Sequence, residues 1–252
     1  MIAFIRVYQS NGNGAPDNDC IANIYNAINE GMGVEIYVEP QPCGTKSGND
    51  QFREVYNFLT TKNIAVKTIW IKITSPITWP NNQKNNIDFI NGFIVEAWAR
   101  FNLKFLQKNG VITGVYTNWY DWQQITDNGQ ITYNQGQIPL WYWNVIGSGL
   151  DAATSPTFDD FRSFGGFSAP MVKQYAQNIC FCGICTSLNV FVNKTITKTL
   201  PANMILEMAN VTVGNLSWMS PIMAKSSKKQ RKNKKLIEKA VNNRKKILSL
   251  VY

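Results

Sequence analysis

Histidine is absent from the 252 residues of this chain. Its absence excludes catalytic triads and dyads that use an imidazole base, and it excludes zinc sites that need an imidazole ligand. Long apolar runs are missing too, because asparagine, glycine or lysine interrupts each hydrophobic stretch before the roughly 18 residues of a membrane-spanning helix are reached. We therefore expect no transmembrane segment, no metal and no cofactor, and any chemistry must come from carboxylates, tyrosine, lysine or cysteine.

Acidic residues are scarce in only one part of the chain. Residues 224–252 carry 11 lysines and arginines against Glu238 as their one acid, whereas residues 1–223 carry 14 basic and 15 acidic residues. The net charge of +9 therefore belongs to a C-terminal tail, which we expect to be helical or disordered. Phosphate contacts would let such a tail bind nucleic acid or an anionic membrane surface.

Cysteine is sparse, with five residues in the chain. Because the number is odd, at least one cysteine is unpaired or pairs outside the chain. The run CFCGIC at 180–185 holds three thiols without an imidazole, which favours disulfides or free thiols over a soft-metal site. A signal peptide is also missing, because Met1–Arg6 offers too few apolar residues before a charge. Either the protein is intracellular or its true N-terminus is truncated.

Extended apolar segments alternate with helical ones over the first 180 residues, a pattern typical of a parallel sheet with crossover helices. The predicted strands are 2–9, 34–40, 67–74, 110–117 and 140–145, and the predicted helices lie around 19–31, 52–59 and 87–97. The loop GNGAPD after the first strand lacks the spacing of a phosphate-binding loop, which favours an irregular (β/α) barrel over an open doubly wound sheet. We expect the barrel over 1–180, an irregular extension over 181–223, and the tail over 224–252.

Six ordered segments resemble the nematode lysozyme-like proteins, a group similar to the protist-type lysozymes of glycoside hydrolase family 25. They are FIRVYQSNGNGAPDNDCIANIYNAINEG, VEIYVEPQP, TIWIKITSPITWPNN, GVYTNWYDWQQIT, LWYWNV and DDFRSFGGFSAPMVKQYAQ. The resemblance implies a TIM-like (β/α) barrel, an extracellular or lysosomal protein, muramidase chemistry on bacterial peptidoglycan, and innate defence against bacteria. It also implies that a signal peptide and a first strand are missing here, and we expect a monomer.

The expected catalytic acids are replaced. The family's DxE pair follows a Trp-aliphatic dipeptide on the strand that resembles 67–74, and those positions hold Lys72 and Thr74. Glycoside hydrolysis uses two carboxyl groups that flank the scissile bond, and neither a lysine nor a threonine supplies one. The sequence therefore predicts a pseudoenzyme-like glycan-binding protein with weak or no hydrolysis.

Other residues at strand ends supply the remaining candidates for a site. Glu39 ends one predicted strand, with Glu35 deeper on the same face, and Asp121 follows another. Aromatic rings stack on sugars, and amides bind hydroxyls. The candidate substrate-binding residues are Glu39, Trp79, Asn118, Trp119, Tyr120, Trp122, Trp143 and Asn144.

Simpler roles compete with these. Asp19 is also a candidate helix cap and Asp121 a solvated loop acid, and one of Trp141 and Trp143 must point into the core.

Three alternatives to this prediction stay open from the sequence. An active lysozyme would need a rearranged acid set such as Glu39 with Asp121. A second alternative assigns the function to the basic tail, through an anionic surface or nucleic acid. A third is that the chain does not function in this form, because a barrel without its first strand has an open edge.

Overall fold

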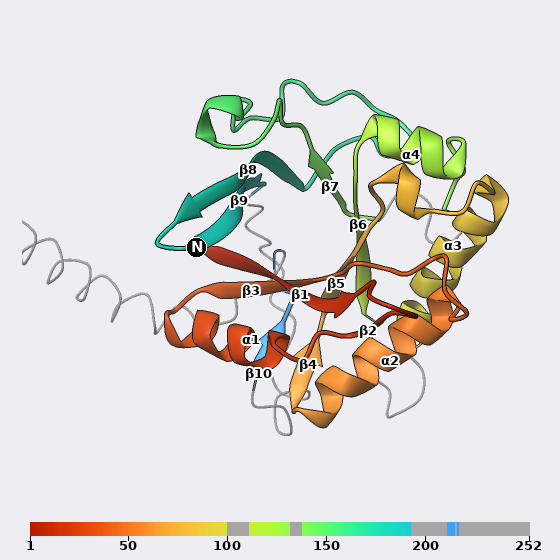
Figure 1. Cartoon of the computed structure of the whole chain (residues 1–252), viewed down its shortest axis with the longest axis horizontal. Helices are drawn as coiled ribbons and strands as arrows, with labels where there is room; N and C mark the ends of the chain where they lie inside the picture. The colour runs from red at the N-terminus through yellow and green to blue at the C-terminus, as the bar shows by residue number, and fades with distance from the viewer. Residues whose placement is uncertain (100–110, 132–137, 193–210, 215, 217–252) are drawn as a thin grey trace, which may run out of the picture.

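The computed structural model describes residues 1–99, 111–131, 138–192, 211–214 and 216 (Figure 1). In chain order its elements are β1 (Ile2–Gln9), β2 (Ala15–Pro16), α1 (Cys20–Asn29), β3 (Gly33–Val38), α2 (Gly48–Thr61), β4 (Ile64–Val66), β5 (Thr68–Lys72), η1 (Pro76–Thr78), α3 (Gln83–Ala99), β6 (Ile112–Thr117), α4 (Trp119–Thr126), β7 (Leu140–Trp143), η3 (Leu150–Ala152), β8 (Val172–Phe181), β9 (Ile184–Phe191) and β10 (Val211–Val213). The five strands and three helices predicted from periodicity are confirmed, with ends that differ by a few residues.

The main sheet has eight strands in the order β2-β1-β3-β5-β6-β7-β8-β9 and curls into a half-barrel (Figure 1). Strands β1, β3, β5, β6, β7 and β8 pair in parallel, while β2 and β9 pair antiparallel at the two edges. Within the described residues no ladder joins β9 to the opposite edge, so a closed TIM-like barrel is not seen. The carboxyl ends of the parallel strands meet at one edge, which is where a site is expected.

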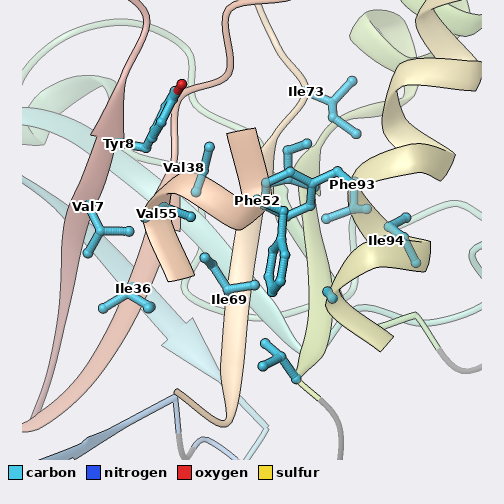
Figure 2. Close-up of a cluster of buried hydrophobic side chains, with 14 of the residues drawn as sticks. Val7, Tyr8, Ile36, Val38, Phe52, Val55, Ile69, Ile73, Phe93 and Ile94 are labelled. Atoms are coloured by element: carbon cyan, nitrogen blue, oxygen red, sulfur yellow. The ribbon is translucent and has the colours of Figure 1, made fainter. Parts of the chain in front are cut away.

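The helices cover the convex face of this sheet and bury its main hydrophobic core. Helix α2 begins at a capping box, in which Ser47 and Asp50 exchange side-chain and backbone hydrogen bonds, and its Phe52, Val55 and Leu59 share one buried face. Figure 2 shows Phe52 and Val55 in the cluster of buried side chains that also holds Ile36 of strand β3 and Phe93 of helix α3. This core holds the parallel strands in place below the carboxyl edge.

Aromatic rings fill the concave face. Trp141 of β7 lies at the centre, with its ring centroid 4.3 Å from Phe4, 4.7 Å from Tyr116 and 5.9 Å from Trp70. Gly114 of β6 makes room for Trp70, because a Cβ at that position would lie 2.3 Å from the indole ring. The interior is therefore a packed layer, and ligand access is left to the strand ends above it.

Two strands lie on either side of the predicted boundary at residue 180. Strands β8 and β9 form a hairpin closed by the disulfide Cys180–Cys185, so the hairpin spans that boundary. Strand β10 pairs with β4, and the Leu216 amide donates to the buried carboxylate of Glu35 at 2.6 Å. The tail over 224–252 lies outside the described residues. No helix in the described ranges is long and apolar enough to cross a membrane.

Candidate functional site at the strand ends

Four charged side chains meet at the carboxyl ends of β1, β3 and β5. The Lys72 ammonium donates to Glu39 Oε1 at 2.8 Å, and Arg6 donates to Glu39 Oε2 at 3.0 Å and to Asp17 at 2.9 Å. Glu39 follows the last residue of β3 and shares the concave face with Glu35, as the period of the strand predicts. The expectation that Glu39 lies at the rim of the sheet is confirmed, and it is paired with the lysine that replaces a family acid.

Tyrosine rings hold the Lys72 side chain from both sides. Its Nζ lies 5.3 Å from the ring centroid of Tyr37 and 5.3 Å from that of Tyr116, within the range of cation–π attraction. Burial, together with the charge of Glu39, raises the pKa of Tyr37 to about 12, and burial raises the pKa of Tyr116 as well. Both phenols therefore stay neutral at physiological pH and serve as packing partners.

Glu39 is held ionised. Burial alone would raise its pKa, but the Lys72 ammonium and the Arg6 guanidinium outweigh burial and keep the pKa below its ordinary value. Both carboxylate oxygens are occupied by these cations. Glu39 is consequently unsuited to deliver a proton to a leaving group near neutral pH.

Asp121 lies at the same edge but is buried, with 3% of its surface exposed. Its Oδ2 accepts the Thr74 hydroxyl and the Trp143 indole N–H, the latter at 3.2 Å. Burial raises the pKa of Asp121 despite these donors and the Ser75 backbone amide. The structure thus brings Thr74, Asp121 and Trp143 together, and the solvated loop acid expected at position 121 is wrong.

Two aromatic side chains protrude beside Asp121. Trp119 and Tyr120 are 60% and 56% exposed in the first turn of α4. The loop expected around Asp121 is instead the start of a helix, because Asn118 caps α4 there by accepting from the Asp121 amide at 2.8 Å. The cap explains why these rings face solvent while Asp121 turns inward.

The other predicted ligand contacts are positioned less favourably. Trp122 is fully buried against Phe167, and Trp79 is buried with its indole N–H donating to the Thr74 carbonyl at 3.1 Å. Trp143 is half-buried, and Asn144 is exposed with its amide donating to Asp160 at 2.6 Å. Of the aromatic candidates, Trp119, Tyr120 and Trp143 therefore keep surface for a ligand.

Sequence reasoning overlooked three residues of this cluster. Arg6, Tyr37 and Tyr116 lie on the concave face next to Lys72 and Glu39. The alternation of side chains along a strand predicts that Tyr37 shares the face of Glu35 and Glu39, since it lies between them. Asp19 occupies the N-cap position of α1 without a side-chain cap hydrogen bond, so its predicted capping contact is wrong.

The cluster therefore has two parts. We call the paired side chains of Asp17, Arg6, Glu39 and Lys72 the charged floor, and the rings of Trp119, Tyr120 and Trp143 the aromatic rim. Neither of the two candidate acids combines solvent access with a proton to give: Glu39 is ionised between two cations, and Asp121 is buried. Within the described ranges no group of three potential ligands is arranged around a metal position.

Comparison with known proteins assigns the chain to a family. The family model described as "Lysozyme-like protein 1" matches residues 1–175. Lysozyme-like protein 2 of Caenorhabditis elegans is 42% identical over 191 residues, which are 75% of this chain and 64% of that protein. The chain thus spans less than two thirds of that relative. A probable GH family 25 lysozyme 2 of Dictyostelium discoideum is 32% identical, over 74% of this chain and 78% of that protein.

Solved structures share the fold at low sequence identity. A muramidase from Acremonium alcalophilum has a TM-score of 0.55 at 17% identity, covering 77% of this chain and 83% of that one. A family GH25 lysozyme from Aspergillus fumigatus has a TM-score of 0.52 at 14% identity, covering 77% and 81%. These likenesses support the half-barrel fold. Together with the family model and the relatives, they show that the chain belongs to the lysozyme-like proteins of glycoside hydrolase family 25.

Proposed function

We propose that this chain is a glycan-binding lysozyme-like protein that holds peptidoglycan, or a related glycan, at the strand ends with little or no hydrolysis. The substrate class comes from relatives that are named as lysozymes and muramidases. The loss of hydrolysis comes from this chain's own residues. Lys72 and Thr74 stand where the resemblance places the two acids.

One observation carries the proposal. Lys72 does more than remove a carboxylate, since its ammonium binds Glu39 at 2.8 Å and, with Arg6, keeps the pKa of that acid low. Retaining and inverting glycosidases both require a carboxylic acid that is protonated when the bond breaks. The ion pair therefore removes a substitute acid from the cluster as well as the original one.

Binding needs no such acid. Trp119 and Tyr120 present exposed rings beside the charged floor, and aromatic faces stack on the apolar faces of sugar rings. The half-buried Trp143 adds a third ring near Asp121. These features support a glycan held at the rim above Lys72 and Glu39.

Co-sedimentation with insoluble bacterial peptidoglycan tests binding. We expect Trp119→Ala to weaken binding by about tenfold, the scale of one lost aromatic contact. Trp98→Ala is the matched control, because Trp98 is also an exposed tryptophan (41%) but lies near the end of α3. Equal binding by both variants, or no binding by the folded wild type, would overturn the proposal.

Hydrolysis by a rearranged acid pair is the second candidate. The raised pKa of Asp121 is the property expected of a general acid, and Glu39 lies at the same sheet edge. This alternative requires that Glu39→Gln abolish the release of reducing ends from peptidoglycan. Unchanged release by that variant would remove it.

We propose an extracellular or lysosomal location, because the Cys180–Cys185 disulfide is of a kind that persists in oxidising compartments. A role in defence against bacteria would follow from peptidoglycan recognition there. Fractionation of expressing cells tests the location: we expect the protein in the medium or in the lysosomal fraction, and retention in the cytosol would contradict the proposal.

A further inference from the structure

We infer that Asp160, held by the buried Lys173, is a positioning residue: it fixes the Asn144 side chain so that its carbonyl oxygen accepts the acetamido N–H of an N-acetylated sugar. The inference rests on the proposed function, because Asn144 directly follows Trp143 of the aromatic rim. It adds to that function a hydrogen-bond acceptor that selects the kind of glycan.

Lys173 is a buried cation that glycan stacking on the rim leaves without a use. None of its surface is exposed, and its ammonium donates to Asp160 Oδ2 at 2.7 Å and to the carbonyl oxygens of Ser155 and Thr157 at 2.7 and 3.0 Å. Its neighbour on β7, Tyr142, has its ring centroid 5.7 Å from this ammonium. A buried ion pair seldom adds net stability. We therefore assign to this pair the placement of Asp160 at the end of β7.

Asp160 is held ionised, so its carboxylate can only accept hydrogen bonds. Partial burial alone would raise its pKa, but the bonds from Lys173, Tyr142 and Asn144 and the charge of Lys173 outweigh burial and keep the pKa below its ordinary value. The Tyr142 hydroxyl donates to Oδ1, and Asn144 Nδ2 donates to Oδ2 at 2.6 Å. Because an ionised carboxylate has no proton to donate, the atom of Asn144 that faces it must be the amide nitrogen.

The backbone of Asn144 is fixed as firmly as its side chain. Its N–H donates to the Gln174 carbonyl at 3.1 Å, and its own carbonyl accepts the Thr154 hydroxyl at 2.6 Å. The residue is exposed at the carboxyl edge, and among the described residues no donor contacts its Oδ1. With the nitrogen bound to Asp160, the side-chain atom that lies away from Asp160 is this carbonyl oxygen.

A fixed acceptor discriminates between the groups of a sugar. A hydroxyl both donates and accepts, so it would tolerate either end of the asparagine amide, whereas an amide N–H can only donate. The acetamido N–H of an N-acetylated sugar is such a donor, and it would be left unpaired against an amide nitrogen. The orientation that Asp160 imposes on Asn144 therefore favours N-acetylated glycans.

Nuclear magnetic resonance of the side-chain amides tests the orientation without any ligand. We expect the Asn144 NH₂ signal, assigned by its loss in Asn144→Ala, to exchange slowly with solvent. Asp160→Asn should remove this protection, because the new amide N–H groups would attract the Asn144 carbonyl instead. Asp159→Asn is the matched control, since the carboxylate of Asp159 accepts from the Thr157 hydroxyl rather than from Asn144. Fast exchange in the wild type, or unchanged exchange in Asp160→Asn, would overturn the orientation.

Co-sedimentation with insoluble peptidoglycan and with chitin tests the consequence for binding, on variants shown to be folded by circular dichroism. We expect Asn144→Ala and Asp160→Asn each to weaken binding to both polymers about three- to tenfold, the scale of one lost hydrogen bond, and Asp159→Asn to bind as the wild type does. The exchanged pair Asn144→Asp/Asp160→Asn returns an oxygen to the exposed position. It should recover most of the binding, although position 160 still lacks the acid that pairs with Lys173.

Each other result decides against a stated part of the inference. Unchanged binding by Asn144→Ala would overturn the acceptor, and no recovery in the exchanged pair would show that Asp160 acts through the fold alone. Chitin carries acetamido groups but no peptides, so weakening confined to peptidoglycan would place the contact on a peptide N–H and overturn the choice of sugar group. Absence of wild-type binding to both polymers would defeat the proposed function, while the amide exchange would still decide the orientation of Asn144.

Discussion

At the scale of single residues, the replacement of one acid by Lys72 changes the behaviour of its neighbours. An aspartate at that position would repel Glu39 and raise its pKa, which is the usual route to a catalytic acid. A lysine does the opposite, and two tyrosine rings hold its ammonium in place. The site is thus built to keep Glu39 charged.

Lys72→Met should show this effect as a loss of stability that depends on pH. The lowered pKa of Glu39 means that the ion pair stabilises the fold above the unfolded pKa, and that this contribution disappears as pH falls through the folded pKa. Both side chains are about a quarter exposed, at 24% and 29%, so we expect at most about 1 kcal/mol at pH 7. Urea unfolding of the variant and the wild type at pH 7 and pH 3 measures this loss in the free energy of unfolding. A loss of equal size at both values would show that Lys72 acts by packing alone.

Gly114 carries the tightest steric requirement of the interior. Gly114→Ala would force a methyl group to 2.3 Å from the buried Trp70 ring, so we expect a loss of about 1–3 kcal/mol in the free energy of unfolding. Gly147→Ala is the control, because its added Cβ would meet the nearest atom, on Ala152, at an ordinary 3.4 Å. Similar urea midpoints for the two variants would contradict the packing described for the concave face.

At the scale of elements, the hairpin of β8 and β9 depends on its disulfide only in part. The bond joins residues five apart, so it restrains a short loop, and the ladder continues along both strands. Loss of the bond in Cys180→Ser/Cys185→Ser should cost about 2 kcal/mol, with the fold retained. Cys182→Ser, which removes a free and exposed thiol from the same turn, should cost almost nothing in thermal unfolding. A comparable loss in that control would indicate that Cys182 pairs in the native protein.

Local patterns predicted most elements, while contacts between distant segments escaped them. The period of two in VEIYV placed Glu35 and Glu39 on one face, and helical spacing identified α2 from Phe52, Val55 and Leu59. The pairing of β10 with β4 and the burial of Asp121 depend on partners tens of residues away or more. No local pattern encodes such contacts.

In the candidate site, too, local patterns predict the residues but not the contacts between distant segments. The position of Glu39 at a strand end predicts its place in the site, and the family resemblance singles out Lys72, but their ion pair needs the order β3-β5 in the sheet. The exposure of Trp119 and the burial of Trp122 follow from the phase of a helix that begins at Asn118. The pattern of Asn118 followed three residues later by Asp121 was an available signal for that helix start.

At the scale of the whole molecule, the half-barrel and the basic tail are predicted to act separately. A chain that ends at Met223 lacks 11 of the 25 basic residues, and it should keep its binding to peptidoglycan. The full chain should bind double-stranded DNA with an affinity that falls steeply with salt, and the shortened chain should lose this binding. Salt-insensitive DNA binding, or equal DNA binding by both chains, would exclude the tail as a polyanion-binding segment.

The central claim is that the strand-end site binds glycan without cleaving it. The most direct measurement is the release of reducing ends from insoluble peptidoglycan by the folded protein, beside an active lysozyme of the same family. We predict release at the level of the buffer control, from protein that nevertheless sediments with the glycan. Release at a rate comparable to the active lysozyme would contradict the account, because Lys72 and Thr74 would then not stand at the catalytic centre.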